Sequence, residues 1–195
     1  MSREEERNLL ERCRAGESTA YEPIVRAYEG RLYGFFYRLT GDADEARDLT
    51  QDTFIRAWRR LHLYSPDRPL VPWLLSIARN LHVDRLRSRN GRENDRVWTS
   101  RPLDILPDPG PAPDRAAIEG EIRDLLWNAL NTLGPLHREI LILKDIEDLD
   151  YREIAAILNI PPGTVASRLH NARAALRDTL RNLDHDHDRD LPVCA

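Results

Sequence analysis

The side chains whose types and spacing could do chemistry in this sequence are polar groups on three predicted helical segments, at 42–61, 70–89 and 150–181. No segment brings together a nucleophile, a base and a group to orient the base, and the sequence has no glycine-rich phosphate loop. An enzyme is therefore the least favoured class. The residue types favour a protein that binds and recognises partners instead. Acids suit a basic partner, arginines suit phosphates, and small polar groups suit base edges.

The segment from Asp150 to Arg181 predicts a short helix, a tight turn and a longer helix. Asp150 and Glu153 have the spacing of a capping box, and Asn159 with the following prolines should end the first helix. An apolar stripe in the second helix is formed by Val165, Leu169, Ala172, Leu176 and Leu180. The opposite face is small, polar and edged with arginine, as a reader of the DNA major groove requires. A purely structural helical hairpin is the alternative.

A second recognition surface is predicted on the helix from Asp42 to Leu61, which also begins with capping-box spacing, at Asp42 and Glu45. The polar residues of its largely exposed face are Asp44, Asp48, Gln51 and Asp52. Its apolar set is Ala46, Leu49, Phe54, Ile55, Ala57, Trp58 and Leu61. Acids beside an exposed edge of Phe54 suit docking on a basic partner helix. An ordinary solvated helix face is the alternative.

The third surface lies on the helix from Leu70 to Arg89 and on the loop before it. The exposed row of this helix is Arg79, Asn80, Asp84, Arg85, Arg87 and Arg89. Arginines can hold phosphates, and asparagine can read base edges. In the loop, His62, Tyr64 and Arg68 could stack on or enclose an unstacked base. Trp73 is in phase with Ile77 and is expected in the core.

The helices that must position these surfaces belong to a predicted all-α fold, which has two small helical domains joined by a proline-rich linker. Residues 1–90 are expected to form the first domain, 91–113 the linker, 114–183 the second domain and 184–195 an acidic tail. The expected helices of the first domain span 4–15, 18–39, 42–61 and 70–89. Those of the second span 114–132 and 136–146, followed by the helix-turn-helix.

Composition sets further limits. Charged residues make up 32% of the chain and the net charge is −4, so basic patches here are local and not a property of the whole. Cys13 and Cys194 are too far apart for a disulfide framework, which suits a reducing cytoplasm. With no signal core and no apolar run long enough to span a membrane, a cytoplasmic location is expected. No cofactor is expected. His185, His187 and Cys194 are metal-ligand types, but a solvated acidic tail is the favoured interpretation.

Taken together, three stretches resemble an extracytoplasmic-function sigma factor, a minimal member of the bacterial sigma-70 family. DEARDLTQDTF at 44–54 resembles the core-polymerase-binding helix of that family, and RPLVPWLLSIARN at 68–80, followed by Asp84, resembles its promoter-melting helix. DYREIA at 150–155 and GTVASR at 163–168 resemble its second DNA-binding domain. The likeness covers nearly all of residues 18–183, in order and with the expected linker between the two parts.

The resemblance implies a role for each set of residues. The set that would dock on the clamp helices of the largest polymerase subunit is Asp44, Asp48, Gln51, Asp52 and Phe54. The set that would meet the minus-ten element of the promoter, with the loop holding a flipped base, is Tyr64, Arg68, Arg79, Asn80, Asp84, Arg85 and Arg87. The set that would face the minus-thirty-five element is Thr164, Ser167, Arg168, His170, Asn171 and Arg173. The implied partners are core RNA polymerase, promoter DNA and an anti-sigma factor.

The sequence departs from the family pattern at Ala166 and Asn171, where many members carry a basic residue. Fewer phosphate contacts and a weaker salt dependence are therefore expected in this half. Two other classes remain open. A stand-alone helix-turn-helix regulator would bind promoter DNA without polymerase, and a sigma-like adaptor or anti-sigma-like mimic would not direct transcription.

Overall fold

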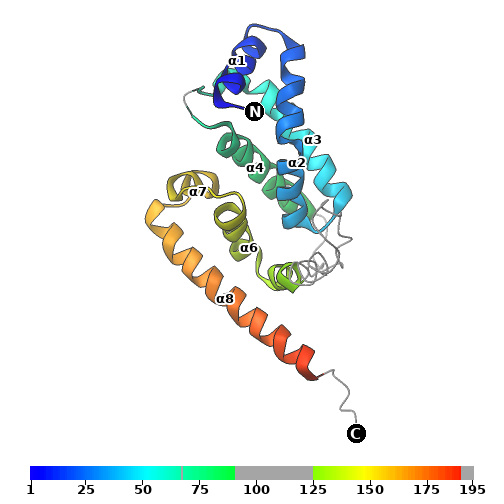
Figure 1. Ribbon diagram of the computed structural model, residues 1–195, viewed down its shortest axis with the longest axis vertical. Helices are drawn as coiled ribbons and strands as arrows, with labels where there is room; N and C mark the ends of the chain where they lie inside the picture. The colour runs from blue at the N-terminus through cyan, green and yellow to red at the C-terminus, as the bar shows by residue number, and fades with distance from the viewer. Residues whose placement is uncertain (67, 91–124, 190–195) are drawn as a thin grey trace. The chain divides into compact units, whose positions relative to one another are not determined.

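The computed structural model describes residues 1–66, 68–90 and 125–189, and every regular element within these ranges is helical. The chain divides into two compact units (Figure 1), each of which is described by itself. The predicted all-α fold of two helical units is therefore confirmed. The predicted linker at 91–113 and the first part of the helix expected from Asp114 lie outside the described residues.

The N-terminal unit is built on three long helices and a shorter leading one. In chain order they are α1 (Arg3–Arg14), α2 (Tyr21–Thr40), α3 (Ala43–Arg59) and α4 (Leu70–Asn90). Short 3-10 turns precede α2 at Ser18–Ala20 and follow α3 at Leu61–Leu63. Helices α2, α3 and α4 pack against one another, and α1 lies along α2. The largest fully buried side chains of this core are Leu10, Ile24, Leu32, Phe35, Phe36, Leu49 and Leu75.

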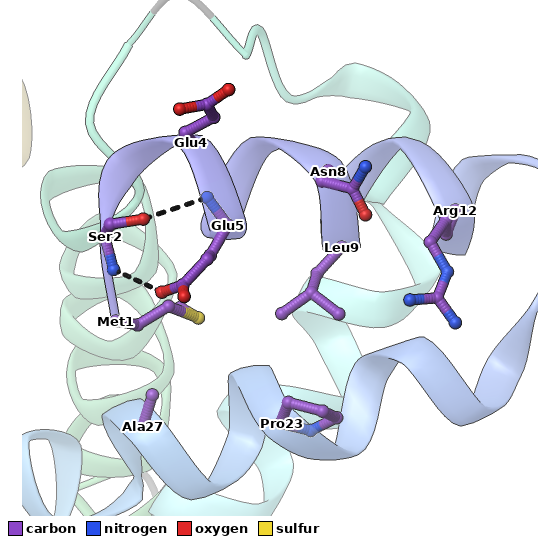
Figure 2. Close-up of a pocket in the computed structure, with 9 residues that line it drawn as sticks. All are labelled: Met1, Ser2, Glu4, Glu5, Asn8, Leu9, Arg12, Pro23 and Ala27. Atoms are coloured by element: carbon purple, nitrogen blue, oxygen red, sulfur yellow. Dashed lines mark hydrogen bonds between the residues drawn. The ribbon is translucent and has the colours of Figure 1, made fainter.

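Local hydrogen bonds explain where these helices begin and end. Helix α1 starts with a capping box that we did not predict: Ser2 Oγ accepts from Glu5 N at 3.2 Å, and Ser2 N donates to the Glu5 carboxylate at 2.7 Å (Figure 2). Helix α2 ends at Gly41, whose φ of 67° is strained for residues with a side chain.

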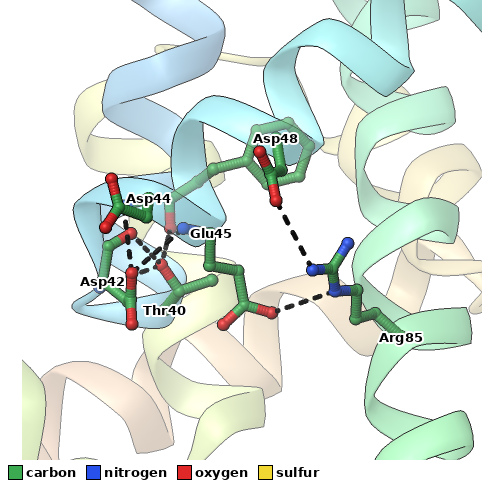
Figure 3. Close-up of polar contacts among 7 residues, drawn as sticks. Thr40, Asp42, Asp44, Glu45, Asp48 and Arg85 are labelled. Atoms are coloured by element: carbon green, nitrogen blue, oxygen red, sulfur yellow. Dashed lines mark hydrogen bonds and ion pairs between the residues drawn. The ribbon is translucent and has the colours of Figure 1, made fainter.

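At the start of α3 only half of the predicted capping box forms. Asp42 Oδ1 accepts from the backbone of Asp44 and Glu45, each at 3.0 Å. The backbone of Asp42 donates instead to Thr40 Oγ1 at 3.2 Å. The Glu45 carboxylate is left to face α4, where it pairs with Arg85 (Figure 3). A residue expected to cap a helix therefore joins two helices.

The C-terminal unit contains a helical stretch at 125–132, then α6 (Pro135–Leu141), α7 (Tyr151–Leu158) and α8 (Pro162–Arg189). The single helix expected at 136–146 is not uniform, because a wider π-helical turn replaces the α-helix from Ile142 to Ile146. Helix α8 continues to Arg189, so the first half of the expected acidic tail, 184–189, is helical backbone. Its last residues, 190–195, which include Cys194, lie outside the described part.

The helix-turn-helix has the local structure that the sequence predicts. Asp150 N donates to the Glu153 carboxylate at 2.9 Å, and Glu153 N donates to Asp150 Oδ1 at 2.8 Å, which completes the capping box of α7. Asn159 has a φ of 53°, and the next amide, of Ile160, donates to Ala155 O at 3.0 Å. This left-handed residue ends α7 and turns the chain towards α8.

A buried arginine closes the helix that precedes α6. Arg138 is 5% exposed, and its Nε donates to Leu130 O at 2.9 Å. Its Nη2 donates to the carbonyls of Asn131 and Leu133. Burial lowers the pKa of Arg138 from its ordinary value. Because the last carbonyls of a helix have no partner within that helix, the guanidinium supplies the donors that the end of 125–132 lacks.

We expect Arg138→Met to unfold this part of the unit locally. Methionine keeps much of the volume but leaves the carbonyls of Leu130 and Asn131 without a charged donor, at a cost of about 2–3 kcal/mol. Hydrogen exchange measured by mass spectrometry should show lost protection over 125–141. Arg152→Met, at an exposed arginine, is the control and should leave protection unchanged. Equal protection in both variants would show that Arg138 does not hold this end of the helix.

Candidate functional site

The exposed face of α3 carries the acids that the sequence placed there. Asp44, Asp48, Gln51 and Asp52 are all exposed. The opposite stripe is buried against α2 and α4 and consists of Ala46, Leu49, Thr50, Thr53 and Ala57. Thr50 and Thr53 can be buried because each hydroxyl donates to the carbonyl four residues earlier, at 2.7 Å. The helix is therefore fixed in rotation, and its acids point away from the core.

The structure corrects the expected role of Phe54. This side chain is only 6% exposed, its ring lies edge-on to Tyr21, and the Tyr21 hydroxyl donates to Phe54 O at 2.9 Å. The exposed apolar group on the acidic face is instead Ile55, at 49% exposure. Ile55 follows Asp48 by seven residues, or two helical turns, and therefore shares its face. The spacing contained this signal, but the prediction grouped Ile55 only with the apolar set of this helix.

Trp58 also differs from expectation. It was predicted to turn inward, yet it remains 37% exposed, with its ring centre 4.9 Å from that of Tyr21. We use the term docking face for Asp44, Asp48, Gln51, Asp52, Ile55 and Trp58. This face is acidic with an apolar centre and edge, so it suits a basic partner that also has apolar groups.

The row predicted on α4 is exposed only in part. Asn80, Asp84 and Arg87 are exposed, while Arg79 and Arg85 are half-buried. Asp84 Oδ2 lies 3.6 Å from Arg56 Nη1 of α3, and its Oδ1 lies 4.0 Å from Arg87 Nη1. Of the predicted row, the side chain of Arg89 lies outside the described part.

Arg85 is held by α3. Its Nε lies 3.6 Å from Glu45 Oε1, and its Nη2 lies 3.7 Å from Asp48 Oδ2 (Figure 3). A predicted DNA-binding arginine and a predicted docking acid are thus partners in one ion-pair cluster. Sequence spacing could not show this, because the two residues lie on different helices.

In the loop before α4, Tyr64 is a core residue. It is 3% exposed, its ring centre lies 5.0 Å from that of Trp73, and its hydroxyl donates to Arg68 O. Arg14 of α1 donates to the Tyr64 carbonyl. Tyr64 therefore shapes the loop from inside and offers no free ring face to a base, in contrast to the expectation. His62 and Arg68 are exposed beside it.

On α8 the predicted reading face is available to a partner. Ser167, His170, Asn171 and Arg173 are exposed, and Thr164 and Arg168 are half-buried. The stripe behind them is buried at Val165, Leu169 and Ala172. Arg173 Nη2 donates to Asp145 Oδ1 at 2.5 Å, and this hydrogen bond raises the pKa of Arg173. The guanidinium thus faces an acid in the free protein.

Metal and redox chemistry find no support in the part of the chain that the structure describes. There, no group of three His, Cys, Asp or Glu side chains could hold a metal ion. Cys13 is 5% exposed, and burial raises the pKa of its thiol, so little reactive thiolate forms. An open pocket of about 760 Å³ lies between α1 and α2, and no residue of the docking face lines it (Figure 2). None of the described helices has the length and apolar character that a membrane span needs.

Comparison with known proteins agrees with this arrangement. Residues 24–92 match Sigma-70 region 2, and residues 123–176 match Sigma-70 region 4. The ECF RNA polymerase sigma factor SigW of Bacillus subtilis is 33% identical over 184 residues, covering 89% of this chain and 96% of that protein. RNA polymerase sigma-H factor of Pseudomonas aeruginosa is 30% identical over 188 residues, covering 94% of this chain and 97% of the relative.

Solved structures give the same result. The sigma factor RpoE from Bartonella quintana, in complex with the anti-sigma factor NepR, aligns with a TM-score of 0.69 and 28% identity, covering 83% of this chain and 96% of that one. CnrH in complex with the cytosolic domain of CnrY aligns with a TM-score of 0.65 and 25% identity. Two helical units, one with an acidic docking face and one with a helix-turn-helix, define a transcription factor of the sigma class. The chain belongs to the sigma-70 family and, within that family, to the ECF group.

Proposed function

We propose that this chain acts as a promoter-specificity subunit, in which α3 docks on core RNA polymerase while α4 and α8 read DNA. The observation that carries the proposal is the exposed docking face, with Ile55 among its acids, one helix away from Arg79 and Asn80. Acids around an apolar centre suit a basic helical surface. The polymerase does the chemistry, and this chain supplies recognition.

The mechanism rests on tethering two weak readers. Helix α8 presents Ser167, His170 and Asn171 to duplex DNA at the minus-thirty-five element, and α4 presents its row to the minus-ten element. Each unit alone makes few contacts. Once both are fixed on polymerase, the second contact becomes intramolecular, which raises the affinity without any new contact.

Opening the duplex is the step that α4 and its loop assist. Unstacking and unpairing one base costs a few kcal/mol, which capture of that base and of the neighbouring phosphates offsets. Tyr64 keeps the loop in place through its hydroxyl and Arg14. His62 and Arg68 are the exposed loop residues that meet the displaced strand, and Arg79 and Arg87 meet its phosphates.

An anti-sigma factor is the partner we propose for the resting state. One of the similar solved structures is a sigma factor in complex with an anti-sigma factor, and another is CnrH in complex with the cytosolic domain of CnrY. The net charge of −4, with arginines facing acids at Arg85 and Arg173, gives the free chain little attraction for DNA. A protein covering the docking face would keep the chain away from polymerase in the cytoplasm.

Reversing two acids of the docking face should abolish the complex with polymerase. Asp48→Arg with Asp52→Arg places like charges opposite a basic surface, so we expect at least a hundredfold weaker binding to core polymerase in a pull-down, with loss of run-off transcription. Glu4→Arg with Glu11→Arg makes the same change in charge at exposed positions on α1 and serves as the control. A complex unaffected by the first pair of changes would favour the stand-alone helix-turn-helix regulator.

Ile55 should contribute more to docking than the buried Phe54 can. Ile55→Asp places a charge at the apolar centre of the face and should weaken polymerase binding about tenfold or more, in line with the loss of one buried aliphatic side chain. Because Ile55 is 49% exposed, the thermal unfolding midpoint should change little. Leu63→Asp, at a leucine that is 69% exposed, is the control. If Ile55→Asp and the wild type bound core polymerase with equal affinity, Ile55 would not be part of the docking face.

A further inference from the structure

Arg85 lies between two acids of different character. Glu45 has only 9% of its side chain exposed, whereas Asp48 has 63% exposed and belongs to the docking face. Arg85 itself is 37% exposed. The guanidinium uses Nε towards the buried acid and Nη2 towards the exposed one, which Figure 3 shows as a bridge from α4 to α3.

This arrangement sets the charge that a DNA phosphate would meet. One guanidinium between two carboxylates gives the cluster a net charge of −1, so a phosphate approaching Arg85 is repelled. Glu45 is enclosed between the helices and stays with Arg85. Asp48 is exposed, and a cationic side chain of a partner can reach it and compete with Arg85 for it.

We propose that Arg85 couples the two binding events of this unit: a cation that pairs with Asp48 releases Arg85 to bind a phosphate of the displaced DNA strand. This inference rests on the proposed function, because the cation belongs to the polymerase surface that meets the docking face. Coupling of this kind is reciprocal, so a strand bound at Arg85 frees Asp48 and strengthens docking by the same factor. Arg85 is thus shared between two partners and is not a phosphate contact alone.

The ion pair of Arg173 does not support the same argument. Arg173 on α8 pairs with Asp145 of the same unit. Asp145 lies outside the docking face, so no partner proposed here removes it from Arg173. Arg85, by contrast, lies in the row on α4 and pairs with Asp48 of the docking face.

The size of the coupling follows from the exposure of the pair. Ion pairs that are partly open to solvent contribute little, so the expected effect is roughly two- to five-fold in affinity. An effect of this size can be measured if each variant removes one charge and keeps a side chain of similar shape.

The direct test uses the free full-length chain and a fluorescein-labelled single-stranded oligonucleotide at low ionic strength. Asp48→Asn imitates the loss of Asp48 to a partner and should raise the affinity roughly two- to five-fold. Asp52→Asn removes the same charge from the same face at a residue that forms no ion pair with Arg85, so it should raise the affinity less. In an Arg85→Gln background, Asp48→Asn and Asp52→Asn should change the affinity for the oligonucleotide equally.

Three results of this cycle would overturn the proposal. Equal gains for Asp48→Asn and Asp52→Asn would show a general effect of charge. A gain for Asp48→Asn that survives Arg85→Gln would show that the strand is held elsewhere. Failure of every variant to bind the oligonucleotide, Asp48→Asn included, would show that releasing Arg85 does not create a strand site.

A second measurement separates this inference from the proposed function. In the absence of DNA, Arg85→Gln should bind core polymerase roughly two- to five-fold more tightly than the wild type, because Asp48 no longer has an internal partner. Polymerase binding that is unchanged by Arg85→Gln would overturn the coupling and leave the proposed function intact. If neither chain bound polymerase, the proposed function would fail, and the coupling would fail with it.

Discussion

The burial of one narrow stripe of α3 governs the N-terminal unit. Ala46 and Ala57 are small enough to let α2 and α4 approach, Leu49 fills the core beside them, and the two threonines between them satisfy their own hydroxyls within the helix. With that stripe buried, α3 cannot rotate without exposing it. Asp48, Asp52 and Ile55 must then face outward, and α4 must run beside them. The docking face and the row that we propose to meet DNA therefore lie on neighbouring helices because of how this core packs.

Much of this could be predicted from the sequence, because it depends on periodicity and local chemistry. The all-α fold, the capping box of α7 and the left-handed end at Asn159 follow from residues a few positions apart. The acids of α3 were placed on its exposed face for the same reason. In each case the interacting groups lie within one or two helical turns, where spacing determines which residues meet.

The errors have a common physical origin, which is contact between helices. Phe54 lies at the edge of the buried stripe, where its ring packs edge-on against Tyr21 of α2. The sequence places Tyr64 in a loop, but in the structure Trp73 and Arg14 contact it and make it a core residue. Glu45 has the spacing of a cap but binds Arg85. No spacing rule reports which side chains of another helix are near, so these assignments needed the structure.

Ion pairs between helices also show how acids balance arginines within the folded chain, whose net charge is modest. Arg85 faces Glu45 and Asp48, and Arg173 faces Asp145, so cations suited to phosphate are balanced by acids before any DNA is present. A protein built in this way is expected to bind DNA poorly until it is placed on a partner. That property suits a subunit that confers specificity on another protein.

The central claim is that the chain directs core polymerase to promoters, and transcription in vitro with mapped start sites tests it most directly. Core polymerase, genomic DNA and this chain should yield transcripts that are absent without the chain. Their start sites should share a minus-ten and a minus-thirty-five element at a fixed spacing. Transcripts that do not depend on the chain, or tight binding of the chain to a palindromic site without polymerase, would contradict the account.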